Sequence, residues 1–208
     1  MKKHTVDPNR QLYIQKQALK PSTFLSPVPA VMVTSGSLEN PNIITLAWAG
    51  TVNSEPPMLS ISVRKSRYSH GLIQKQGTFG VNLVSQGLCW ETDFCGVKSG
   101  RDLDKFKETG LTCVASPELG IPMIAESPVH LECKVREVLE LGSHDLFIAD
   151  IVGVQVANAL MDRKGTVDMR KADLVAYNHG EYYSLGKILG FFGYSIAGKE
   201  VLKRRKRT

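Results

Sequence analysis

The chain has 208 residues, of which 42% are hydrophobic and 22% are charged, a composition typical of a globular domain with its own core. No run approaches 18 consecutive apolar residues and no apolar signal segment follows the first lysines, so we expect a cytoplasmic protein that neither spans a membrane nor is secreted. The net charge of +6 is concentrated at the ends: residues 1–20 carry +4 and residues 198–208 carry +5, which leaves −3 between them and argues against a nucleic-acid-binding fold.

These patterns predict three parts: an N-terminal arm (1–26), one folded domain (27–197) and a basic C-terminal tail (198–208). The basic run 203–207 is typical of a solvated tail. It also fits a polyanion-binding patch, in which case the chain would be a binding module rather than an enzyme. No aromatic platform accompanies the run, so we expect no nucleic-acid partner.

The first half of the domain reads as strands with one helix. The expected elements are a hairpin of strands 28–35 and 42–50, a strand at 58–63 and a helix at 69–76. Pro56-Pro57 is expected to block regular pairing before the third strand. Ser66 or Ser69 is expected to cap the helix, and Gly77 to end it.

The second half adds a long hairpin. The expected elements are a strand at 79–84, short helices at 89–94 and 102–109, a brief strand at 111–115, and strands at 129–141 and 146–156 joined by a turn at Gly142-Ser143. A bulge is expected near Glu137, where the alternation of the long strand slips. Strands and helices do not alternate as βαβ units, so we predict a mainly β, antiparallel barrel with short helices in its connections.

Cations gather where the third strand gives way to the helix. Arg64, Lys65 and Arg67 lie just before Ser69, and a helix N-terminus attracts phosphate through its N–H groups and its dipole. The same residues also fit an ordinary capped helix with solvated cations. A second basic loop spans Lys98–Lys105 and contains Ser99 and Gly100, which suit a tight turn near a ligand.

The end of the strand at 42–50 alternates small and bulky residues, a pattern that lets a flat ring approach the backbone. Trp48 fits either a wall of such a site or the core. His144, at the start of a strand, fits either a structural role or contact with a nicotinamide or an anion.

The four cysteines form no C-x-x-C pair, so we expect no metal site. Cys95 fits a buried inert thiol or, alternatively, a redox role.

Taken in order, the motifs resemble the flavin reductase-like family and its flavoredoxin branch. They are Asn42-Ile43-Ile44-Thr45-Leu46-Ala47-Trp48, Pro56-Pro57, Ser66-Arg67-Tyr68-Ser69, Gly77-Thr78-Phe79-Gly80-Val81-Asn82, Ser99-Gly100-Arg101-Asp102-Leu103-Asp104-Lys105-Phe106, Leu131-Glu132-Cys133 and Gly142-Ser143-His144. The resemblance implies an antiparallel Greek-key split β-barrel of the FMN-binding type. It also implies a homodimer that binds FMN near the subunit interface.

The resemblance also implies roles for individual residues. Along the isoalloxazine it places Thr45, Ala47 and Trp48. Around the ribityl chain and the phosphate it places Ser62, Val63, Arg64, Arg67, Tyr68 and Ser69. The pocket would be completed by Asn82 and by the Ser99–Lys105 loop, with Ser99, Gly100 and Lys105 as its named members.

The implied activity is that of an FMN-dependent oxidoreductase, in which NAD(P)H reduces bound FMN and the electrons pass to free flavin, a metal chelate or a partner protein. In relatives that accept a nicotinamide, a Gly-Asp-His turn helps to place it. Here the turn reads Gly142-Ser143-His144, with serine in place of the aspartate. That departure motivates an alternative, an FMN-containing electron carrier that is reduced by a protein partner.

Overall fold

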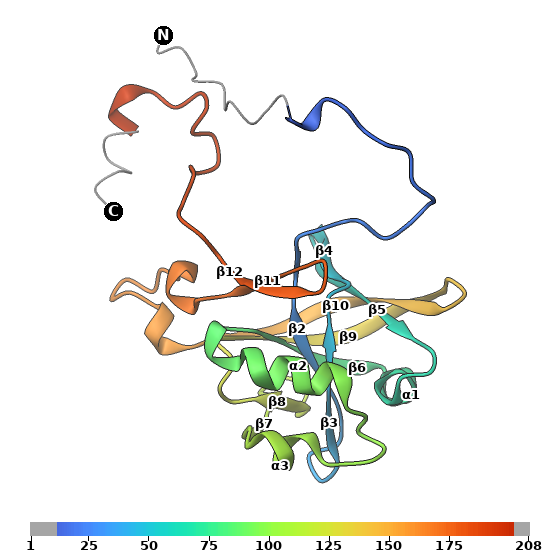
Figure 1. Ribbon diagram of the computed structural model, residues 1–208. Helices are drawn as coiled ribbons and strands as arrows, with labels where there is room; N and C mark the ends of the chain where they lie inside the picture. Colours follow the sequence, from blue (N-terminus) through green and yellow to red (C-terminus); the bar gives the residue numbers. More distant parts are fainter. Residues whose placement is uncertain (1–11, 202–208) are drawn as a thin grey trace.

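The computed structural model describes residues 12–201 and confirms a mainly β, antiparallel split barrel (Figure 1). Within those residues, seven strands form the barrel sheet in the order β3-β2-β6-β9-β10-β5-β4, and every neighbouring pair is antiparallel. The strands are β2 (Val31–Gly36), β3 (Pro41–Leu46), β4 (Ala49–Ser54), β5 (Pro57–Arg64), β6 (Thr78–Leu83), β9 (Val129–Glu140) and β10 (His144–Val156).

The barrel is split between β3 and β4, the two strands at the ends of that order. Only Ala47 and Trp48 join them, so the sheet must curl until its two edges lie a dipeptide apart. The prediction of one continuous strand over 42–50 is therefore wrong: the chain leaves one edge and joins the other at this point. Ser62 N–H donates to Trp48 O at 2.9 Å and fixes the crossing.

The core lies on both faces of β2, whose six residues are all buried. Val31 and Val33 point into the barrel and pack in a cluster that includes Phe79 and Phe147. Met32, on the opposite face, packs in an outer cluster beneath the helices. Burial on both faces explains why this strand reads as a continuous apolar run rather than an alternating one.

Short helices and small sheets cover the outside of the barrel. The helices are α1 (Tyr68–Gln76), α2 (Cys89–Val97) and α3 (Lys105–Thr109). The 3₁₀ turns are η2 (Gln86–Leu88), η3 (Asn158–Leu160) and η4 (Met169–Ala172). The small sheets comprise β1 (Val28–Pro29), β11 (Val175–Asn178) and β12 (Glu181–Ser184) in one, and β7 (Cys113–Ala115) and β8 (Pro122–Ile124) in the other.

Several local expectations are confirmed and others need correction. Gly77 ends α1 in the left-handed conformation, as expected. The β9–β10 register skips Arg136, beside the expected bulge near Glu137. Pro57, however, pairs with Ser54, so the prolines do not block regular pairing but sit at the turn of the β4–β5 hairpin. The strands β8, β11 and β12 were not predicted.

Two segments leave the barrel on the same side of the molecule, residues 12–26 and residues 185–201 (Figure 1). We call them the N-terminal and C-terminal arms. Both expose large apolar side chains: Leu12, Tyr13, Ile14, Leu19, Phe24 and Leu25 in the first, and Leu185, Ile188, Leu189, Phe192, Tyr194, Ile196 and Val201 in the second. The expected division at 26 and 197 stays a prediction, and the basic run 203–207 lies outside the described residues. Among residues 12–201, no helix is long and apolar enough to cross a membrane.

Candidate functional site

Two adjoining cavities lie beside the split in the barrel, with volumes of about 410 Å³ and about 290 Å³. Ile44, Arg64 and Arg67 line both, so we treat them as one cleft with a basic end and an aromatic end. Of the residues predicted from sequence, Tyr68, Ser69, Ser99, Gly100 and Lys105 line the basic end, and Thr45, Ala47, Trp48, Ser62 and His144 line the aromatic end.

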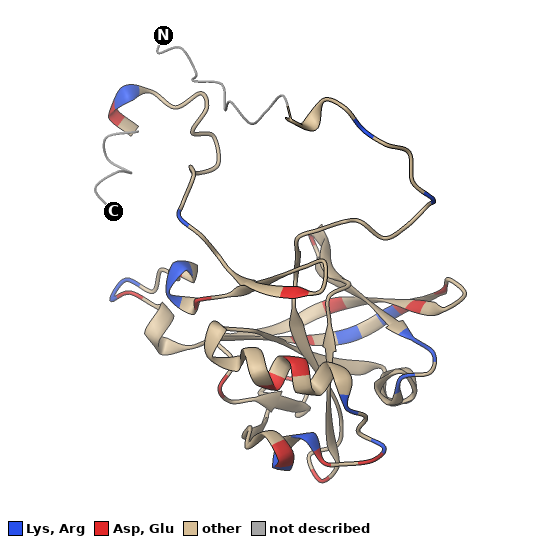
Figure 2. Cartoon of the chain, in the orientation of Figure 1, with Lys and Arg blue, Asp and Glu red and all other residues tan. Residues whose placement is uncertain are grey.

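Positive charge dominates the basic end, the larger cavity. Its lining includes five cations: Arg64, Arg67, Lys98, Arg101 and Lys105. Asp102 is the one carboxylate that lines it among the described residues. The cations come from the end of β5, the start of α1, the loop between α2 and α3, and the first residue of α3 (Figure 2). This excess favours a ligand group with more than one negative charge, such as a phosphate.

Helix α1 begins at the basic end. Its N-cap residue is Arg67, which makes no capping hydrogen bond, so the expectation that Ser66 or Ser69 caps the helix is wrong. The first turn holds no acidic residue. His70 N–H donates to Arg67 O at 3.1 Å, which leaves the earlier N–H groups of the first turn and the positive dipole end to an external anion. The buried Ser69 Oγ accepts a hydrogen bond from Asn42 Nδ2 at 2.7 Å, which leaves its own proton to be donated into the cavity.

Gly100 brings the loop after α2 against this helix. A Cβ on Gly100 would lie 1.9 Å from Asn42 Oδ1 and 3.2 Å from Tyr68 Cδ1. The guanidinium of the next residue, Arg101, lies 5.9 Å from the centre of the Tyr68 ring. Only glycine therefore allows the loop to close over the Asn42–Ser69 hydrogen bond and bring its cations to the cavity.

Lys105 lies buried at the wall of the basic end. Its ammonium donates to the backbone carbonyls of Ile43 and Cys95, both at 2.7 Å. The pKa of Lys105 is lowered to about 8, mainly by burial; the charge of Arg67 adds to the lowering, and Cys95 opposes it. The amine is therefore a cation at neutral pH that can lose its proton in mildly alkaline solution.

The aromatic end is walled by rings. Trp48 and His144 lie with their ring centres 4.6 Å apart, and Tyr177 and Tyr182 meet edge to face at 5.4 Å. The Trp48 side chain is 45% exposed, so its reading as a core residue is wrong. Small residues also line this end, among them Ala47 on the β3–β4 crossing, Ala30 and Gly96. The space suits a flat, partly apolar ring.

His144 occupies the mouth of the aromatic end, on the first residue of β10. Partial burial lowers the pKa of His144, and the charge of Arg64 lowers it further. The imidazole is therefore mainly neutral at pH 7, and we assign the Ser143 hydroxyl as donor to Nδ1, 2.9 Å away. This leaves an N–H at Nε2. Its position in the cleft favours the ligand-contacting reading over the structural one.

Two predicted site residues do not line the cleft. Val63 has no exposed surface and packs inside the barrel, because residues alternate along β5 and its neighbours Ser62 and Arg64 take the cleft side. Asn82 is also fully buried. Its amide donates to Met32 O at 3.0 Å and accepts from Ile124 N–H at 2.9 Å, so it joins strands instead of facing a ligand.

Sequence reasoning missed other residues that line the cleft: Ala30, Ile44, Leu46, Ser66, Gly96, Lys98, Tyr177 and Tyr182. Lys98 belongs to the basic loop already noted, so its charge was a usable signal. Arg101 and Asp102, which lie within the predicted Ser99–Lys105 loop, also line the cleft. Tyr177 and Tyr182 had no comparable signal, because pairing of β1 with β11 brings that small sheet to the cleft from far along the chain.

The alternative of a redox role for Cys95 finds no support in its surroundings. The side chain has no exposed surface, and burial raises the pKa of the thiol to about 11. A buried, protonated thiol is a poor nucleophile. All four cysteines are free thiols.

Comparisons with known proteins agree with this geometry. Residues 24–186 match the model of the flavin reductase like domain. The structure of flavoredoxin from Desulfovibrio vulgaris (Miyazaki F) is 31% identical, with a TM-score of 0.81 over 88% of this chain and 100% of that one. An uncharacterized protein of Archaeoglobus fulgidus is 31% identical over 71% of this chain and 82% of its own. An NADPH-flavin oxidoreductase of Streptomyces viridifaciens is 25% identical over 61% of this chain and 65% of its own.

Proposed function

The chain belongs to the flavin reductase-like family, and from this premise we propose that it is an FMN-dependent oxidoreductase. The observation that carries the proposal is the single cleft, which is basic at one end and aromatic at the other. A flavin mononucleotide has the matching form, because its phosphate is anionic and its isoalloxazine is flat and partly apolar.

The residues of the basic end fit the phosphate. Arg64, Arg67 and Lys105 would neutralise its charge, while Ser69 and the first N–H groups of α1 would donate hydrogen bonds to it. Trp48, from the β3–β4 crossing, would form a wall beside the ring.

When bound, the flavin would supply the hydride and electron chemistry. The protein's part is to orient the ring, to exclude water from part of it and to leave one side open to a donor or acceptor. His144 lies at that opening with an N–H at Nε2, so it can donate a hydrogen bond to an incoming substrate. We assign it a placing role rather than a proton-transfer role.

A titration tests the proposal directly. The apo-protein is expected to quench the fluorescence of added FMN with saturation at one equivalent per chain, and to bind riboflavin, which lacks the phosphate, at least about tenfold more weakly. Equal affinities for FMN and riboflavin would show that the basic end does not bind the phosphate. An absence of quenching by either compound would overturn the proposal.

Two versions of the proposal differ in the electron donor that reduces the flavin. The reductase version has NAD(P)H as donor and is favoured by the opening beside His144 and by the Streptomyces viridifaciens relative. The carrier version has a protein partner as donor and is favoured by the flavoredoxin similarity and by Ser143 in the turn. We expect anaerobic stopped-flow mixing with NADH or NADPH to bleach the flavin band rapidly. Bleaching only by a reduced partner protein would leave the carrier version.

Lys105 makes FMN binding pH-dependent. The pKa of Lys105 in the apo-protein is about 8, and a bound phosphate raises it, so above that pH binding takes up a proton. The dissociation constant should be constant just below pH 8 and rise above it, by at most about tenfold per pH unit. Fluorescence titrations from pH 7 to 9.5 measure this. Lys105→Met should abolish the rise, whereas the exposed Lys107→Met should keep it.

The arms support a homodimer as the working form. They carry thirteen exposed large apolar side chains, and each such side chain left in water forgoes about 1.5–3 kcal/mol of possible burial energy. Arm residues 12–26 and 185–201 carry net charges of +2 and +1, while residues 27–184 carry 14 basic and 18 acidic residues. In a dimer, the positive arms of one copy would complement the net negative barrel of the other. Sedimentation should give about twice the chain mass of 22.9 kDa, and a monomer at micromolar concentration would contradict the dimer.

A further inference from the structure

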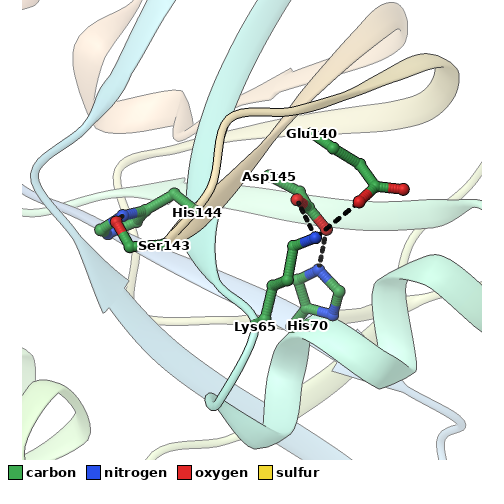
Figure 3. Close-up of polar contacts among 6 residues, drawn as sticks. All are labelled: Lys65, His70, Glu140, Ser143, His144 and Asp145. Carbon is green, nitrogen blue, oxygen red and sulfur yellow. Dashed lines mark hydrogen bonds and ion pairs between the residues drawn. The ribbon is translucent and has the colours of Figure 1, made fainter.

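The segment that would bind the phosphate, residues 64–70, is restrained by contacts on its side away from the cleft. Of residues 64–70, five line the basic end of the cleft: Arg64, Ser66, Arg67, Tyr68 and Ser69. The other two, Lys65 and His70, make contacts with one carboxylate, Asp145 (Figure 3). They stand near the two ends of the segment, so a single side chain restrains both the end of β5 and the first turn of α1.

The geometry of the contacts is specific. His70 Nε2 lies 2.7 Å from Asp145 Oδ2, and both side chains are less than a tenth exposed. Lys65 Nζ lies 3.3 Å from Asp145 Oδ1 and 2.6 Å from Glu140 Oε2. Lys65 is therefore engaged away from the cleft, which corrects its expected place among the phosphate-binding cations.

Electrostatics support the same restraint. Burial alone would raise the pKa of Asp145, but its hydrogen bond with His70 and its ion pair with Lys65 outweigh this and hold the pKa below its usual range. Asp145 is thus an anion throughout the neutral range. The ring of His70 also packs edge-on against Phe147, with ring centres 5.3 Å apart, which fixes its orientation.

Strand β10 connects this restraint to the other end of the cleft. Successive residues of a strand point to opposite faces, so His144 reaches the aromatic end while Asp145 turns to helix α1 (Figure 3). The pairs His144↔Arg64 and Asp145↔Val63 tie the same stretch of β10 to the end of β5. The phosphate segment therefore cannot shift without disturbing the start of β10.

We propose that Asp145, acting through His70 and Lys65, is a positioning residue that sets the phosphate subsite and thereby the preference for FMN over riboflavin. The inference rests on the proposed function. Asp145 touches no ligand: it holds Arg67, Ser69 and the N–H groups of α1 where a phosphate can meet all of them. A residue that only stabilised the fold would affect both ligands alike.

The test compares the FMN and riboflavin dissociation constants of the full-length protein and its variants. Asp145→Ala should weaken FMN binding at least about tenfold and riboflavin binding less than about threefold, because only FMN uses the phosphate subsite. Asp150→Ala is the matched control. Asp150 lies on the same strand and is ion-paired with Arg136 at 2.9 Å, and it does not line the cleft, so its loss should leave the ratio unchanged.

A second pair of variants covers the case in which Asp145→Ala does not fold. His70→Gln keeps a donor near the position of Nε2 and should retain the ligand preference, whereas His70→Leu removes the donor and should lose it. An unchanged ratio in both Asp145→Ala and His70→Leu would overturn this inference alone. A wild-type protein that binds neither ligand would overturn the proposed function and this inference with it.

Discussion

Replacing Arg67 by alanine is expected to weaken FMN binding by about 1.5–3 kcal/mol, a rise in the dissociation constant of about 10- to 150-fold. Arg67 is the N-cap residue of α1 and lines both ends of the cleft. No ion pair engages it within residues 12–201, so its charge is available to a ligand. Its loss removes a charge-assisted hydrogen bond at the place where the helix dipole acts.

Isothermal titration of Arg67→Ala with FMN and with riboflavin measures the loss of affinity and shows whether it comes from the contact with the phosphate. Riboflavin affinity should change little, because the lost contact is to the phosphate. The matched control is Lys75→Ala, which removes a cation from the last turn of the same helix, outside the cleft. If Arg67→Ala and Lys75→Ala bound FMN equally well, Arg67 would not be part of the phosphate site.

Gly100→Ala is the second change with a large expected effect. Its new Cβ would overlap Asn42 Oδ1, so the loop must move away from α1 and the Asn42–Ser69 hydrogen bond must distort. Overpacking of this kind costs about 1–3 kcal/mol. The overlap destabilises only the arrangement in which the loop closes the cleft. We therefore expect FMN affinity to fall by about 5- to 150-fold while the barrel stays folded.

The control for Gly100→Ala is the same change at Gly71, inside α1. A Cβ there meets nothing within 4 Å, and alanine is the better helix former by about 0.8–1.0 kcal/mol. Gly71→Ala should therefore raise the melting temperature slightly and leave the FMN dissociation constant unchanged. Wild-type FMN affinity in Gly100→Ala would show that the loop does not close the site.

The sequence predicted the strands well where the side-chain period was clear. The long hairpin over 129–156 and its bulge were readable from alternation alone. The prediction failed over 42–50, because nothing local distinguishes one strand from two strands that meet across the split of a barrel. That crossing depends on the curl of the whole sheet, which is a property of tertiary structure.

The site was predicted in part for similar reasons. Cations at a strand-to-helix junction have a local physical meaning, so Arg64 and Arg67 could be found. Strict alternation from Ser62 to Arg64 would have excluded Val63. Asp145 could not have been found, because its role depends on strand β10 lying beside β5, which places a residue from far along the chain behind residues 64–70.

The measurement that tests the central claim most directly is a crystal structure of the protein grown with excess FMN. We expect the phosphate to lie between Arg67 and Gly100 at the N-terminus of α1, with the isoalloxazine beside Trp48. A cleft without flavin, or a flavin bound with its phosphate away from α1, would contradict the account.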